Sequence, residues 1–370
     1  MPDALDSTRI TAARVHAIAG KGPLRVADAL KAGITRGALR AAIASGDLDR
    51  PSHGVIAVAD PDVTSPTLQQ RCRAIAVRRP SIVFSHSTAS ELQHLPLLRN
   101  ADRLIHGYAQ HAARAGDLLL HEGRIPTDHI VEVDGIRMTS PLRTALDLAR
   151  GLPFAEALIP LDAALRSEVL QAMKGSGLRD DDAVESREHQ RVVREHVEHL
   201  LLSLRHLHGA RNARRALAAA SPLAESPAES ASRGHLLTAG IIPRALQARV
   251  IDADGRERRL DFLLDTGVAG EVDGFVKYEG DGGRYAVRQE KRRDLALQRI
   301  GLATVHWSAE EAFWHPQRVV RLVRHALISH PATGKWPPGS CPISPTKRQP
   351  VEGESTHASD RLPGESAQMA

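Results

Sequence analysis

The chain has few aromatic residues and almost no cysteine. Phe, Trp and Tyr together make up 3% of its 370 residues, so stacking of nucleic-acid bases on aromatic platforms is not expected to be its mode of binding. Its two cysteines, Cys72 and Cys341, are far apart in the sequence. Two such residues build neither a disulfide framework nor a cysteine-based zinc site.

Long apolar runs are also missing. No stretch approaches the roughly 20 residues that a transmembrane helix needs, and the first residues lack the basic start and apolar core of a signal peptide. We therefore expect a cytoplasmic protein with no membrane partner. The length and a hydrophobic content of 42% are enough for two or three domains, each with its own core.

Basic residues outnumber acidic ones. The formal net charge is +5 and the isoelectric point is near 9.5. Most of the basic residues are arginines, whose guanidinium groups suit phosphates and the edges of guanine bases. This charge favours an anionic partner, although many proteins with a basic isoelectric point bind no nucleic acid.

Three helical segments and a hairpin are predicted over residues 9–59. The segments end at Gly20, Gly33 and Gly46, and residues 48–59 resemble two short strands joined by a turn. This order is typical of a winged helix-turn-helix, with Thr35 as the N-cap of the recognition helix and Arg36 and Arg40 on its exposed face. The alternative is a small helical domain with two ordinary surface arginines.

A family resemblance rests on this segment. The string G-I-T-R-G-A-L-R at residues 33–40, followed by Gly46, Arg50 and H-G-V at 53–55, resembles the N-terminal domain of AbiEi-family antitoxins from type IV toxin–antitoxin systems. The resemblance implies a winged helix that binds DNA at its own promoter through Thr35, Arg36, Arg40 and Arg50. It also implies a nucleotidyltransferase-type toxin as a partner.

Residues 66–150 alternate between predicted helices and strands. The phrases S-H-S-T-A at 85–89 and R-T-A-L-D-L-A at 143–149 are similar to the middle of AbiEi-like proteins. We expect a helix capped by Ser87 or Thr88. Arg143 and Asp147 are four residues apart, the usual spacing of an ion pair on a helix, and the resemblance suggests a partner-binding role for this unit.

Residues 153–218 are predicted to be mostly helical. Histidines at 189, 196, 199 and 206 fall on one side of a helix, where we favour a solvated polar face over a metal ladder. Farther along, residues 226–229 read as a capping box with proline at the first helical position, which by itself accounts for Glu229.

Acidic residues recur on neighbouring strands near the C-terminus. Residues 258–307 are predicted to form strand, turn, strand, helix and strand, with Asp261 on the first strand and Glu271 and Asp273 on one face of the second. Carboxylate oxygens are ligands that Mg²⁺ prefers, and Lys277 follows closely. The alternative is an exposed acidic turn with a surface ion pair, which would contribute little to stability.

A second resemblance covers residues 221–328. Asp261, the string E-V-D-G-F-V-K-Y at 271–278, E-K-R-R-D at 290–294 and the strand V-H-W at 305–307 resemble the Vsr-like branch of the PD-(D/E)XK endonuclease fold. The resemblance implies that Asp261, Glu271 and Asp273 hold Mg²⁺, that Lys277 contacts the phosphate or the water, and that Glu290 and Glu229 point towards the metal. It places Lys291, Arg292 and Arg293 at the nucleic-acid backbone.

One position departs from that pattern. The usual E-x-K triplet is E-V-D at 271–273, so Lys277 or Lys291 replaces the catalytic lysine or the site is inactive.

We therefore predict an α/β multidomain chain. Its parts are a winged helix-turn-helix at residues 1–60, a middle α/β unit at 61–152, a helical connector at 153–220, an endonuclease-like αβββαβ domain at 221–330 and a disordered tail at 331–370. The predicted function is DNA binding with Mg²⁺-dependent cleavage of phosphodiester bonds. The alternative is a non-enzymatic antitoxin that represses its own operon promoter.

Overall fold

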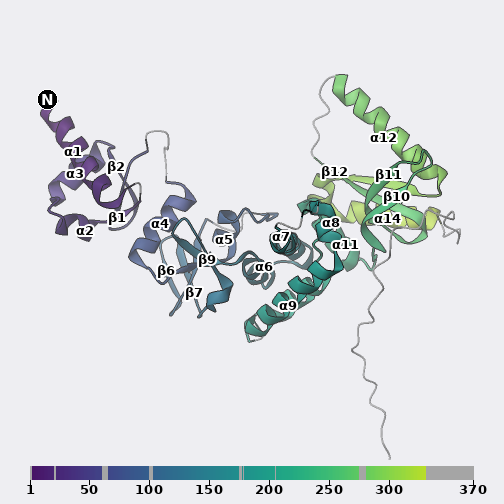
Figure 1. Ribbon diagram of the computed structural model, residues 1–370, viewed down its shortest axis with the longest axis horizontal. Helices are drawn as coiled ribbons and strands as arrows, with labels where there is room; N and C mark the ends of the chain where they lie inside the picture. Colours follow the sequence, from purple (N-terminus) through teal and green to yellow (C-terminus); the bar gives the residue numbers. More distant parts are fainter. Residues whose placement is uncertain are drawn as a thin grey trace, which may run out of the picture.

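The computed structural model describes residues 2–20, 22–60, 66–99, 103–174, 177, 179–204, 206–274 and 281–330. Three separate β-sheets follow one another along its long axis, with a group of helices between the second and the third (Figure 1). Lys277 and the tail that begins at Pro331 lie outside the described residues, so the predictions for them stay predictions. Within the described ranges, no helix has the length and apolar content needed to cross a membrane.

The N-terminal unit combines three helices with a three-stranded sheet of order β1-β3-β2. Its elements are α1 (Pro2–Ala19), β1 (Leu24–Arg25), α2 (Val26–Lys31), α3 (Arg36–Ala44), β2 (Leu48–Ser52) and β3 (Val55–Val58). The second predicted helix covered residues 23–33, but its Leu24 and Arg25 pair with β3 instead. This helix–strand–helix–helix–hairpin order is compatible with a winged helix.

The second sheet has six strands in the order β6-β7-β5-β4-β9-β8. The elements of this region are α4 (Leu68–Arg78), β4 (Val83–Phe84), α5 (His86–Leu92), β5 (Ile105–Ala109), β6 (Ala113–Ala115), β7 (Leu118–Glu122), a 3₁₀ turn (Thr127–His129), β8 (Ile130–Val133) and β9 (Ile136–Thr139). Ser85, rather than the predicted Ser87 or Thr88, precedes the first residue of α5.

Helices fill the space between the second and third sheets. They are α6 (Pro141–Ala149), α7 (Phe154–Ala172), α8 (Asp180–Glu185), α9 (Arg187–Leu204) and α10 (Ala210–Ala219). Their buried leucines, valines and alanines form one apolar core. Helix α9 ends at Leu204, so His206 follows the helix. The prediction that four histidines share one helix face is therefore wrong for His206.

The third sheet is mixed and has the order β10-β11-β12-β13. Its region contains α11 (Pro227–Thr238), β10 (Ala245–Ile251), β11 (Glu257–Leu263), a 3₁₀ turn (Asp265–Gly267), β12 (Val268–Asp273), α12 (Asp281–Arg299), β13 (Ala303–Ser308), α13 (Ala309–Trp314) and α14 (Pro316–Ser329). Two helices rather than one follow β13, because Pro316 starts a new helix after His315.

Each face of the third sheet has its own covering. Phe262 and Trp307 pack with residues of α11, α13 and α14 on one face, and the Trp307 indole donates a hydrogen bond to Ser232 Oγ at 2.8 Å. Gly270 is required there, because a Cβ at this position would lie 2.6 Å from the Trp307 ring. On the other face Leu263 packs with Leu297 of α12. Side chains that alternate with Phe262 and Trp307 therefore point towards the α12 side.

Candidate nucleic-acid interface and carboxylate site

Helix α3 is anchored at its start and along one face. The Thr35 hydroxyl accepts a hydrogen bond from the Ala38 amide at 3.1 Å, which is the predicted N-cap. Leu39 and Ala42 are 3% and 0% exposed and pack in the N-terminal core. The opposite side of the helix, which carries Arg36, is thereby left to solvent.

Three predicted DNA contacts are exposed arginines. Arg36 and Arg40 lie one turn apart on α3, and Arg50 lies on β2 of the hairpin. Among the residues that the structure describes, none of the three forms an ion pair, whereas Arg25 of the same unit bonds Asp28 at 2.8 Å. Their charge is therefore available to a phosphate. The fourth predicted contact, Thr35, uses its hydroxyl to cap the helix.

The C-terminal site starts from a pair of facing carboxylates. Strands β11 and β12 are antiparallel, and Asp261 and Glu271 are the residues that come directly after their last pair, Phe262 and Gly270. The Asp261 charge acts on Glu271, so the two side chains are close. Directly opposed side chains lie on the same face of a sheet. The Asp261 carboxylate also accepts a hydrogen bond from the Val272 amide at 2.8 Å. The two predicted ligands thus come together, as the alternation of the sequence indicated.

Burial and like charge act on both groups. Burial raises the pKa of Glu271 to about 7; the nearby Asp261 charge adds to this, while Arg293 and His306 oppose it. The pKa of Asp261 is raised by burial as well, against hydrogen bonds from Val272 and Gln247 that lower it. Two acids held together in this way favour a shared proton or a cation over two free charges.

Arg293 supplies a positive charge at this place. Its guanidinium donates hydrogen bonds to Glu271 Oε1 at 2.9 Å and to the Arg259 carbonyl oxygen at 2.8 Å. We predicted Arg293 at the nucleic-acid backbone, but in the structure it faces the sheet and neutralises Glu271. Lys291 and Arg292, its neighbours on α12, are exposed. A metal bound to Glu271 would have to share the carboxylate with Arg293.

His306 completes the site and was missed by the sequence analysis. Parallel pairing with β12 sets it opposite Glu271. Its Nδ1 lies 3.4 Å from Asp273 Oδ1 and 3.6 Å from Glu290 Oε1, and its Nε2 lies 3.3 Å from Asp294 Oδ1. Although partial burial opposes it, the surrounding carboxylates raise the pKa of His306. The signal was present in V-H-W, because alternation turns His306 away from the buried Trp307.

The third predicted metal ligand belongs to a different set. Asp273, Glu290 and His306 each offer a ligand atom within 4.8 Å of the others. The described residues therefore present two adjoining acidic groups on one face: Asp261 with Glu271, and Asp273 with Glu290 and His306. Carboxylate oxygens are the ligands that Mg²⁺ prefers, so the acidic residues fit the predicted ion. The His306 imidazole suits a transition metal rather than Mg²⁺.

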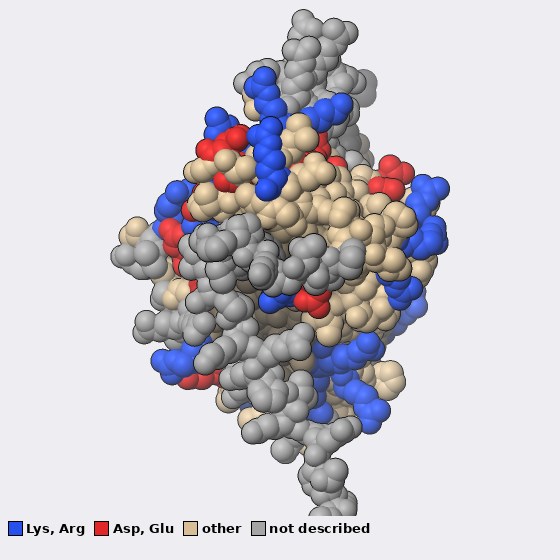
Figure 2. Space-filling view, turned by 90° about the vertical axis from the view of Figure 1, so that its right-hand side faces the viewer, with Lys and Arg blue, Asp and Glu red and all other residues tan. Residues whose placement is uncertain are grey.

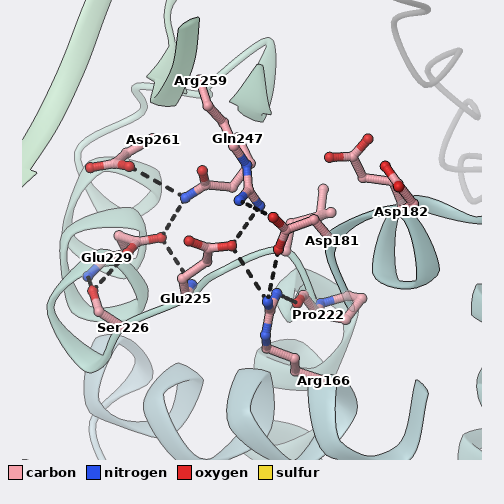
Figure 3. A network of polar contacts seen from close by, with 12 residues as sticks. Arg166, Asp181, Asp182, Pro222, Glu225, Ser226, Glu229, Gln247, Arg259 and Asp261 are labelled. Carbon is pink, nitrogen blue, oxygen red and sulfur yellow. Dashed lines mark hydrogen bonds and ion pairs between the residues drawn. The ribbon is translucent and has the colours of Figure 1, made fainter. Parts of the chain in front are cut away.

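Glu229 is tied to this face through Gln247. The Gln247 amide nitrogen donates to Glu229 Oε2 at 2.8 Å and to Asp261 Oδ1 at 3.3 Å (Figure 3). Gln247 has a φ of +50°, which non-glycine residues rarely adopt, and it lies between Leu246 and Ala248, which pair with β11 in an unbroken register. Burial raises the pKa of Glu229, and the Asp261 charge acts in the same direction.

The capping role of Glu229 differs in detail from the prediction. Ser226 caps α11 by accepting from the Glu229 amide at 3.1 Å. The Glu229 carboxylate, however, accepts from the Glu225 amide, one residue before the N-cap, and from the Ser226 hydroxyl. The Glu229 carboxylate thus stabilises the start of α11 and is also connected to Asp261 through Gln247.

The described basic side chains do not form one continuous patch on the face shown in Figure 2. Lys and Arg occur there in small groups, with Asp and Glu among several of them.

One comparison with known proteins bears on the N-terminal unit. Residues 16–58, from α1 to the end of β3, match the family model described as "Transcriptional regulator, AbiEi antitoxin". No curated protein matches the chain. The segment that contains α3 and the hairpin is therefore similar to an antitoxin family of transcriptional regulators.

Proposed function

We propose that the protein is a DNA-binding transcriptional regulator that reads DNA through α3. The observation that carries the proposal is the pair Arg36 and Arg40: both are exposed, one turn apart and without a carboxylate partner in the described chain, on a helix within the matched segment. Guanidinium groups on a recognition helix reach base edges and phosphates of the major groove. Arg50 on the hairpin would add a backbone contact.

The more specific form of this proposal is an antitoxin that represses its own operon. It is supported by the description of the matched family and by the antitoxin-like strings of the N-terminal and middle regions. In this form the partners are the operon promoter and a toxin of the nucleotidyltransferase type.

Binding of the full chain to the DNA upstream of its gene tests the proposal. In a fluorescence anisotropy titration at fixed salt, the double variant Arg36→Ala/Arg40→Ala should weaken binding by about 2–6 kcal/mol if both side chains contact bases, because each good contact contributes about 1–3 kcal/mol. The matched control is Arg321→Ala, an exposed arginine of α14. Equal affinity of wild type and double variant would exclude α3 as the reading element.

A second candidate function, Mg²⁺-dependent cleavage of phosphodiester bonds, is favoured by one observation. Asp261 and Glu271 lie on adjacent strands, Glu271 is buried and Asp261 is half-buried, and both have raised pKa values. These two residues would hold the ion, with Asp273, Glu290 and His306 next to it. Bound Mg²⁺ would supply stabilisation of the negative charge that develops on the phosphate.

Incubation of the purified chain with DNA and RNA, with Mg²⁺ or with EDTA, tests this candidate. Cleavage should require Mg²⁺ and should fall at least tenfold in Asp261→Asn and in Glu271→Gln. Glu310→Gln, which changes an exposed carboxylate of α13, should cleave as wild type does. If the wild-type protein cuts neither single-stranded nor double-stranded substrates, the nuclease candidate is rejected and DNA binding alone remains.

A further inference from the structure

A group of three histidines lies on the second sheet, away from both sites above. His86 is the first residue of α5, His106 lies on β5 and His121 on β7. Strands β5 and β7 are parallel with Tyr108 opposite His121, so His106 and His121 occupy one face, two positions apart along the ladder. The start of α5 is held over this face because the Thr88 hydroxyl accepts from the His106 amide at 2.8 Å.

The imidazole rings are close together. Each histidine offers a ring nitrogen within 4.8 Å of the other two. His106 Nδ1 lies 2.9 Å from His121 Nε2, and the ring centroids of His86 and His121 are 4.2 Å apart. Nitrogens bound to one tetrahedral zinc ion at bonds of about 2.0–2.1 Å lie about 3.3 Å apart, so small side-chain rotations bring this set to that geometry.

The backbone at His86 is strained in a way that helps to place its ring. Its φ is +51°, a backbone conformation that non-glycine residues rarely adopt. Ser85 Oγ lies 2.9 Å from His86 Nδ1, which fixes the ring and leaves Nε2 as the ligand atom. A metal-binding histidine usually donates a hydrogen bond from its second ring nitrogen to a neighbouring group.

The neighbouring arginines do not form an anion-binding site, because each guanidinium already has protein partners. Arg143 Nε bonds Asp147 at 3.0 Å, and its guanidinium lies over the Tyr108 ring. Arg150 bonds the same carboxylate at 3.2 Å and the His208 carbonyl oxygen at 2.8 Å. Neither guanidinium therefore offers a site for phosphate, whereas three imidazoles are a ligand set for a transition metal.

We propose that His86, His106 and His121 bind one divalent transition-metal ion, with Zn²⁺ as the best match. Imidazole nitrogens suit Zn²⁺, Cu²⁺, Ni²⁺ and Fe²⁺ rather than Mg²⁺ or Ca²⁺. Three protein ligands leave the fourth position of a tetrahedral ion for water or for a group from a partner. The site ties α5, β5 and β7 together and is independent of the proposed DNA reading by α3.

Metal titration of the full-length chain tests the proposal. After removal of metal with a chelator, wild-type protein should bind one equivalent of Zn²⁺ and, with Co²⁺, develop the visible absorption of a four-coordinate ion. His121→Ala, at a half-buried position, should weaken binding at least tenfold. His111→Ala is the matched control: it removes an exposed histidine between β5 and β6 and should bind as wild type does.

A second control addresses the group Asp128, His129 and His199, whose ligand atoms are also close together. His199→Ala should leave Zn²⁺ binding unchanged. The proposal fails if wild-type protein takes up no Zn²⁺ or Co²⁺ at micromolar concentration, if His121→Ala binds as tightly as wild type, or if His199→Ala abolishes binding. Because the wild-type titration needs no variant, the proposal stays testable even if His121→Ala does not fold.

Discussion

Single side chains of the C-terminal site carry charge that the fold makes costly. Glu271 is 7% exposed and lies near the Asp261 charge, which Arg293 and His306 oppose. Exposed acids in a turn would titrate normally and matter little, so the burial of Glu271 argues against the acidic-turn interpretation. The site retains an acid in a place where it lowers stability, which is common where a group has a functional role.

The raised pKa of Glu271 predicts a pH-dependent difference from Glu271→Gln. The folded protein holds this proton more tightly than the unfolded chain does, so wild type keeps its full stability below pH 4.5 and loses part of it as pH rises to about 7. The loss is at most about 3 kcal/mol. In urea denaturation at pH 4.5 and pH 8, the free energy of unfolding of Glu271→Gln relative to wild type should be higher at pH 8. The same difference in unfolding free energy between the two proteins at both pH values would contradict the raised pKa of Glu271.

At the level of helices and strands, the N-terminal unit depends on local signals. Helix α3 begins where Thr35 provides a side-chain acceptor for the first amides, and Gly46 follows its end with a φ of +83°. The position of Arg36 follows from the same cap, because it is the first residue of the helix. The stability of this start therefore affects the proposed recognition surface.

Removal of the cap should loosen the start of α3. Thr35→Ala should cost about 1 kcal/mol of local stability, while Thr35→Ser, which keeps the hydroxyl, should cost less. Hydrogen exchange at the Ala38 amide should be faster in Thr35→Ala than in wild type or in Thr35→Ser. Equal exchange in all three proteins would mean that the hydroxyl does not hold this amide.

For the full chain, the contact between α7 and α11 joins the helical region to the third sheet. Asp162 of α7 and Arg233 of α11 form an ion pair at 2.5 Å with 1% and 6% exposure. Next to it Gly234 allows the two helices to approach closely, because a Cβ there would lie 2.5 Å from the Ala155 Cα. The third sheet is thus held against the helices by a buried contact.

A methyl group at this contact should separate the two helices. Gly234→Ala should destabilise the protein by about 1–3 kcal/mol or more, because backbone rather than a flexible side chain is in the way. Gly151→Ala is the control, since a Cβ at Gly151 meets nothing within 4 Å. Thermal unfolding should show a lower midpoint for Gly234→Ala alone. An unchanged midpoint would mean that α7 and α11 do not pack this closely.

Local sequence signals were sufficient for α3 and for the strands that carry the acids. Caps and glycines delimit α3, and two-residue alternation places Asp261, Glu271 and Asp273, because these features depend on neighbours in the chain. Contacts between distant segments followed from the tertiary structure alone. Pairing of β12 with β13 brings His306 to Glu271, α12 turns Arg293 inwards, and Gln247 of β10 donates a hydrogen bond to Glu229 of α11. Such contacts depend on register and helix packing, which no local pattern of residues specifies.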